Sequence, residues 1–137
     1  MVTVFDAEPN RLIEETAKKL KDMKLEKPAF VGLVKSGSHT QRPPQHEDFW
    51  YVRCASILRH TYVNSGAGVQ KLRRHYGGGK RRGVKPKKHA PAGGSAIRKA
   101  MQALENAGLL AKEGKGRAVT AKGRKLLDKA AKESVKA

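Results

Sequence analysis

Thirteen Lys and Arg side chains in the middle of this sequence have the chemistry to neutralise the phosphates of a nucleic acid. From Phe49 to Leu104 no Asp or Glu accompanies them, because all 12 acidic residues of the chain lie outside this stretch. Charges of one sign repel one another unless a polyanion lies against them. We therefore predict that these side chains bind RNA. They are Arg53, Arg59, Lys71, Arg73, Arg74, Lys80, Arg81, Arg82, Lys85, Lys87, Lys88, Arg98 and Lys99.

The charge of the whole chain also indicates an anionic partner. The formal net charge is +18 and the isoelectric point is about 10.4. Nucleic acid and an anionic membrane are the two candidates. Membrane fits poorly, because no stretch approaches the roughly 20 consecutive apolar residues of a spanning helix. The first residues also lack the basic and apolar regions of a signal peptide, so we expect a cytosolic protein without a membrane partner.

The residue types that support catalysis or metal binding do not gather in this sequence. The five histidines lack the H-x-x-x-H spacing of a metal-binding helix, and Cys54 is the only cysteine. Within its apolar helical pattern, Cys54 is expected to be a small buried side chain. Gly77 to Lys80 lacks the spacing of a phosphate-binding loop, and Gly66-Ala67-Gly68 is only a fragment of a dinucleotide fingerprint. We expect no metal, no cofactor and no enzymatic activity.

Helical periodicity predicts the elements that position the basic side chains. An amphipathic helix should begin at Pro9 and run to about Met23. Ser36 to Asp48 is predicted to be an extended loop. The next helix should begin near Asp48 and run to about Val63, and it is apolar around most of its circumference. Such a helix should be central and buried.

The polar and aromatic residues of this central helix have different expected places. Arg53, Arg59 and His60 should lie at a charged surface, because an arginine leaves water only with a partner. The aromatic residues have faces on which RNA bases could stack. At helical spacing within an apolar pattern, however, they are more simply core residues. These are Trp50, Tyr51 and Tyr62.

The second half of the chain is predicted to contain a basic loop, a hairpin and three more helices. A short helix ends near Tyr76, and residues 77–94 form a glycine-rich basic loop that we expect to become ordered on RNA. Ser95 should cap a fourth helix that Gly108 ends. A short hairpin and a last helix capped by Thr120 follow.

This order of elements predicts a mainly α, winged-helix-like bundle of about five helices around a central buried helix, with one short β-hairpin. At 137 residues, the chain is expected to form a single domain.

Five segments of the chain resemble the ribosomal protein S19e family, the nineteenth small-subunit protein of the eukaryotic and archaeal type. The resemblance runs nearly from end to end. It departs from the family pattern at Phe30, Cys54 and Ala121, none of which belongs to the basic set. The length and the lack of a long tail resemble archaeal members. The matching segments are Phe49-Trp50-Tyr51-Val52-Arg53-Cys54-Ala55-Ser56-Ile57-Leu58-Arg59-His60, Gly66-Ala67-Gly68-Val69, Tyr76-Gly77-Gly78, Arg82-Gly83-Val84-Lys85-Pro86 and Ala103-Leu104-Glu105.

The resemblance implies a structural constituent of the small ribosomal subunit in the cytoplasm. It implies a fold that docks on ribosomal RNA of the subunit head, beside neighbouring head proteins, and a part in late maturation of the subunit. By matching motif, the residues that contact RNA would include Arg53, Arg59, Arg98 and Lys99. Outside the ribosome we expect a monomer.

One alternative from another class is a winged-helix DNA-binding transcriptional regulator. In such a protein the fourth helix would enter a major groove and the hairpin would touch the backbone. The distribution of charge favours RNA, because the basic residues are spread over a loop and several helices instead of one recognition helix.

Overall fold

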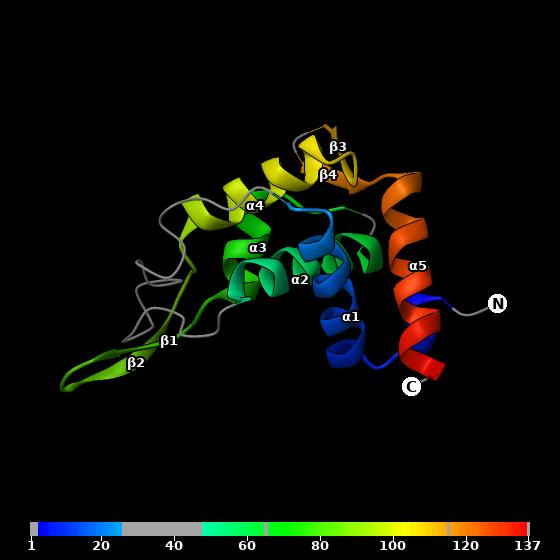
Figure 1. Ribbon diagram of the computed structural model, residues 1–137. Coiled ribbons are helices and arrows are strands. Elements are labelled where there is room, and N and C mark those ends of the chain that lie inside the picture. The colour runs from blue at the N-terminus through cyan, green and yellow to red at the C-terminus, as the bar shows by residue number, and fades with distance from the viewer. Residues whose placement is uncertain (1–2, 26–47, 65, 115, 137) are drawn as a thin grey trace.

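The computed structural model of the chain describes residues 3–25, 48–64, 66–114 and 116–136. Phe30 and the predicted loop from Ser36 lie outside the described residues, apart from Asp48 at the end of that loop. The five helices expected from the sequence are present (Figure 1). In chain order the elements are η1 (Val4–Asp6), α1 (Pro9–Asp22), α2 (Phe49–Val63), α3 (Val69–Tyr76), β1 (Gly78–Arg82), β2 (Lys85–Ala90), α4 (Gly94–Asn106), β3 (Leu110–Glu113), β4 (Gly116–Val119) and α5 (Ala121–Lys136).

Helix α2 lies at the centre and packs against α1, α4, α5, β4 and η1. Its buried side chains extend from Trp50 to Thr61, as the sequence predicted for a central helix. Trp50 is buried, and Tyr51 and Tyr62 are partly buried against the same core, which confirms the core assignment of the aromatic residues. Cys54 is buried too, and burial raises the pKa of its thiol. The side chain therefore behaves as a small apolar group.

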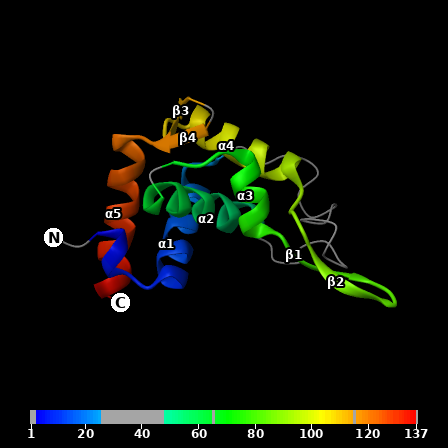
Figure 2. The ribbon, with the colours of Figure 1, turned by 180° about the vertical axis from the view of Figure 1, so that it is seen from behind.

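Helices α1 and α5 lie side by side, and both pack against α2 (Figures 1 and 2). Helix α1 starts at Pro9 as predicted, since a proline at the first helical position has no N–H that needs a partner. Leu12 and Leu20 of α1 are fully buried. An ion pair joins Lys19 Nζ to Glu133 Oε2 of α5 at 3.0 Å. The two ends of the described chain therefore pack together.

Strands β3 and β4 form the short hairpin that the sequence predicted. Ala67 pairs with Arg117 of β4 through two backbone hydrogen bonds of 3.0 and 2.9 Å, so the segment before α3 adds one bridge to the hairpin. This arrangement of helices and hairpin is winged-helix-like, as expected. Thr120 caps α5, since its Oγ1 accepts a hydrogen bond of 3.2 Å from the Gly123 N–H.

The start of α4 differs from the prediction, whereas its end agrees with it. Gly93 is the N-cap and Gly94 the first helical residue, so the predicted cap Ser95 already lies inside the helix. A glycine can also take the N-cap position. The prediction chose Ser95, two residues later, because serine is a common N-cap residue. At the other end Gly108 has a positive φ of 82°, as expected of the glycine that follows a helix.

The largest difference is a second hairpin, formed by β1 and β2, where the sequence indicated a glycine-rich loop over residues 77–94. The described residues thus contain two hairpins instead of one. The strands pair antiparallel from Gly78 with Ala90 to Arg82 with Lys85, and Gly83 turns the chain with a φ of 70°. Both strands are almost entirely polar, so the alternation of apolar residues that usually marks a strand is missing.

Candidate nucleic-acid interface

The thirteen basic residues occupy four successive parts of the fold: α2, α3, the β1–β2 hairpin and α4. Nine of them are exposed, three are half-buried, and Arg81 lies in β1 with a side chain outside the described part. Arg81 aside, no member of the set forms an ion pair with an acidic residue that the structure describes. The half-buried ones are Arg53, Arg59 and Arg73, and the exposed ones are Lys71, Arg74, Lys80, Arg82, Lys85, Lys87, Lys88, Arg98 and Lys99.

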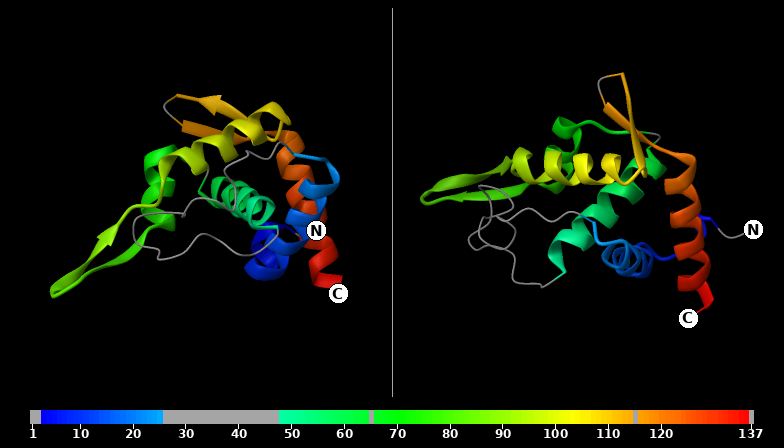
Figure 3. Two further views of the ribbon diagram at one scale, coloured as in Figure 1. Left: turned by 60° about the vertical axis from the view of Figure 1, so that its left-hand side comes forward. Right: turned by 45° about the horizontal axis from the view of Figure 1, so that its top comes forward.

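The β1–β2 hairpin projects from the end of the molecule opposite α5 (Figure 3). Neither strand has an extensive contact with any helix. Lys80 lies directly opposite Lys88, and Arg82 lies directly opposite Lys85. Like charges placed opposite each other in this way destabilise a strand pair. The hairpin is therefore a projecting arm, and repulsion between its own charges weakens the pairing of its two strands. An anion bound against it would reduce this repulsion.

The base of this arm is held by Arg73. Its Nε donates a 2.9 Å hydrogen bond to the carbonyl of Ala92, and the Ala92 N–H donates one of 2.9 Å to the carbonyl of Arg73. The sequence predicted Arg73 as an RNA-binding residue. Its half-buried side chain also ties α3 to the chain that returns from β2. This role depends on Ala92, 19 residues away, and no local pattern reveals it.

Arg53 is also more enclosed than the sequence predicted. Its guanidinium carbon lies 4.0 Å from the ring centre of Tyr76 and 5.2 Å from that of Phe49. Desolvation lowers the pKa of Arg53, while the Tyr76 hydroxyl acts in the other direction. Ser56 holds that hydroxyl at 2.6 Å. Arg53 was expected at a charged surface, and it is only partly exposed: it lies on aromatic faces in a groove of about 400 Å³ between α1, α2 and α3.

Arg59 lies where α2 meets α3, next to two histidines. The His60 and His75 rings are 4.4 Å apart, and His75 meets the Tyr76 ring edge to face at 4.8 Å. The Arg59 Nε and the His60 Nδ1 are buried without a hydrogen-bond partner in the described structure. The sequence marked His60 as a polar residue at a charged surface, but no spacing signal could pair it with His75.

Helix α4 presents Arg98 and Lys99 to solvent, as predicted. Its other face is buried, with Ile97, Met101 and Leu104 in the core. Because α4 packs on both α2 and α3, the backbone positions of Arg98 and Lys99 are fixed relative to those two helices.

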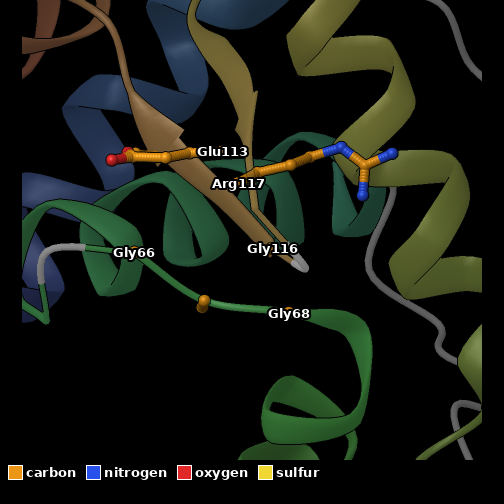
Figure 4. Close-up of a pocket in the computed structure, with 7 residues that line it drawn as sticks. Gly66, Gly68, Glu113, Gly116 and Arg117 are labelled. Carbon is orange, nitrogen blue, oxygen red and sulfur yellow. The ribbon is translucent and has the colours of Figure 1, made fainter.

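A pocket of about 290 Å³ lies where the 66–68 segment meets the β3–β4 hairpin (Figure 4). Figure 4 shows Glu113 and Arg117 pointing in opposite directions, and Arg117 Nε instead donates to Glu105 Oε2 at 3.0 Å. The pocket therefore has no gathered acid and base. Nor does the described part of the chain contain a cluster of three His, Cys, Asp or Glu residues that could hold a metal ion. None of its helices is long and apolar enough to cross a membrane.

Comparison with known proteins identifies the chain's family. The family described as ribosomal protein S19e matches residues 3–137. The chain belongs to the ribosomal protein S19e family. The S19e chain is 42% identical to small ribosomal subunit protein eS19 of Aeropyrum pernix, over 97% of the chain and 90% of that relative. It is 44% identical to small ribosomal subunit protein eS19A of Saccharomyces cerevisiae, over 82% of the chain and 79% of that relative. With eS19 of Emericella nidulans it shares 39% identity, over 98% of the chain and 93% of that relative.

Membership of the S19e family confirms the resemblance seen in the sequence. It makes the chain a structural ribosomal protein and not an enzyme, and its place is the small subunit of the cytoplasmic ribosome. The mainly helical, winged-helix-like fold agrees with that membership.

Proposed function

We propose that this S19e chain binds ribosomal RNA of the small-subunit head through the basic surface formed by α2, α3, the β1–β2 hairpin and α4. One observation carries the proposal: nine exposed Lys and Arg residues of this surface have no ion-pair partner among the described acids. A folded RNA supplies phosphates on several sides at once, which suits a surface spread over helices and a projecting arm.

The parts of this surface contribute differently. The lysines of the hairpin and of α3 and α4 supply charge, which gives affinity without sequence preference. The half-buried Arg53 is fixed on Tyr76, and Arg73 fixes the base of the arm. Held in this way, the charges keep one spacing that matches one folded RNA. Arg59, Arg98 and Lys99 complete the contact on α2 and α4.

The same interface would serve assembly. We expect the chain to join the head of the small subunit next to other head proteins, and to support a late step of subunit maturation. Outside the subunit it would be a monomer. Cells depleted of the protein should accumulate a precursor of small-subunit RNA, and the purified protein should cosediment with small subunits in a sucrose gradient.

A matched pair of triple variants tests the role of the arm. The first replaces Lys80, Lys87 and Lys88 by Ala, and the second replaces three exposed lysines of α5, namely Lys125, Lys129 and Lys132. Both lose the same charge. If each arm lysine contacts one phosphate, the arm variant should lower the slope of log affinity against log salt by about two to three, and the α5 variant should barely change it. Equal slopes for the two variants would contradict the proposed surface.

Competition separates this function from that of a DNA-binding regulator. At one fixed salt concentration, unlabelled small-subunit RNA should displace a labelled fragment of the same RNA far better than duplex DNA does. A regulator would show the opposite order, because its recognition helix would read base edges in a major groove.

A further inference from the structure

Four nitrogen-bearing side chains converge where α2 meets α3. Arg59 and His60 come from α2, and Lys71 and His75 come from α3, where a separation of four residues places them on one face. The His60 and His75 rings are 4.4 Å apart, and the His75 and Tyr76 rings meet edge to face at 4.8 Å. Lys71 and His75 are exposed, so the junction is open to a ligand.

Two of these groups lack partners that their burial requires. The Arg59 Nε and the His60 Nδ1 are both buried, and neither forms a hydrogen bond in the described structure. Buried polar atoms without partners are uncommon in folded proteins and are destabilising. No described carboxylate forms an ion pair with any of the four side chains. The junction therefore has concentrated donors and positive charge and no negative group of its own.

This surrounding disfavours the charged form of the histidine. Burial lowers the pKa of His60, and the nearby His75, Lys71 and Arg59 lower it further. In the free protein, His60 is therefore neutral at pH 7, since its pKa falls below the ordinary value of about 6.5. A negative charge at the opening of the junction would offset the effect of these three neighbours and so raise the pKa of His60.

We propose that the junction of Arg59, His60, Lys71 and His75 is a binding site for a phosphate of the RNA, and that its two histidines take up one proton when that phosphate binds. The inference rests on the proposed RNA binding and adds His60 and His75, which are not among the thirteen basic residues. The proton is shared by the pair, because two imidazolium rings at this separation would repel each other. It comes from solvent and returns there when the RNA dissociates.

The sign of the pH effect follows from this exchange. Because the bound form holds more protons, RNA affinity rises as pH falls. The rise is limited to the pH range between the lowered pKa of His60 in the free protein and its higher pKa in the complex. Within that range, uptake of one proton changes affinity by up to about tenfold per pH unit. Outside this pH range, the affinity no longer changes with pH through this site.

The test measures the affinity of the full chain for a small-subunit RNA transcript between pH 5.5 and 8 at constant salt. The wild type should bind more tightly at the acidic end, and the double variant His60→Gln with His75→Gln should lose most of this pH dependence. The double variant Lys125→Gln with Lys129→Gln is the control, because both side chains are exposed on α5, outside the proposed RNA-binding surface. That variant should keep the wild-type profile.

A second measurement does not depend on the variants folding. Nuclear magnetic resonance titration of the wild-type His60 ring should give a higher pKa with RNA than without it. An unchanged or lower pKa in the complex would overturn the inference, as would a double variant with the wild-type pH profile. If RNA binds with a steep salt dependence in either case, the proposed function stands and only the proton-coupled site is wrong. If no RNA binds at any pH, both fail.

Discussion

Replacing Lys88 by Glu should strengthen the β1–β2 hairpin and weaken RNA binding at the same time. Lys88 lies directly opposite Lys80 in the strand pairing, so the substitution turns a repulsive cross-strand pair into an attractive one. A purely structural role for the hairpin predicts a gain or no effect on function. An RNA-binding role predicts a loss, and the two effects can be measured separately.

The sizes of the two effects follow from the pairing and from the charge. Cross-strand charge pairs are worth about 0.2–1 kcal/mol, and both lysines are exposed, so the gain in hairpin stability should be a few tenths of a kcal/mol. On the RNA side, one phosphate contact is lost and a repulsive charge is added. The slope of log affinity against log salt should therefore fall by about one to two.

Amide hydrogen exchange and filter binding provide the two measurements. Exchange of the backbone N–H groups in β1 and β2 should slow in the Lys88→Glu variant, and affinity across a range of KCl concentrations should fall. Lys88→Ala should lie between the variant and the wild type in both assays. Lys132→Glu on α5 carries the same charge change and should leave both unaltered. Faster exchange in the hairpin, or wild-type RNA affinity, would refute the reasoning.

Three further predictions concern the packing that holds the surface. Arg73→Lys keeps the charge but removes the Nε hydrogen bond to Ala92, so it should lower stability by about 1–2 kcal/mol in calorimetry while the salt slope of RNA binding stays the same; an unchanged melting temperature would contradict this role. In Gly123→Ala, the new Cβ would lie 2.5 Å from the Leu109 carbonyl oxygen, so chemical denaturation should show a loss of more than about 1 kcal/mol. Gly79→Ala, whose Cβ would meet only the Lys87 side chain at 3.9 Å, should cost much less, and equal losses would argue against the close approach. Since burial raises the pKa of the Cys54 thiol, the native protein at pH 8 should resist a thiol reagent until it unfolds, and a fast reaction in the folded state would show that Cys54 is accessible.

The helices could be predicted from the sequence because their signals are local. Pro9 marks the start of α1, Gly108 follows α4 with a positive φ, and Thr120 caps α5. The apolar circumference of α2 indicated its central place, which the burial of Trp50 and Ile57 confirms. In each case the residue that determines the conformation lies within one turn of the element it starts or ends.

The arm could not be predicted in the same way. Its strands are stabilised by backbone pairing and carry almost no apolar side chains, so composition indicated a loop. The one local clue was Gly83, which provides the positive φ of the turn. The positions of Arg53 and Arg73 depend on Tyr76 and Ala92, 23 and 19 residues away, and contacts at such separations leave no mark in residue spacing.

The packing of η1 and α1 against α5 has a consequence for the newly made chain. The Lys19–Glu133 ion pair joins residues 114 positions apart, and α5 is synthesised after every other described helix. The part of the apolar face of α1 that packs on α5 therefore stays uncovered until α5 has been made, although α2 covers another part earlier. Closing so long a loop is entropically costly and slow. The two strands of the arm are joined by only a few residues around Gly83, so they are synthesised close together and before α5. The positive charge of the arm is therefore present before α5 completes the core.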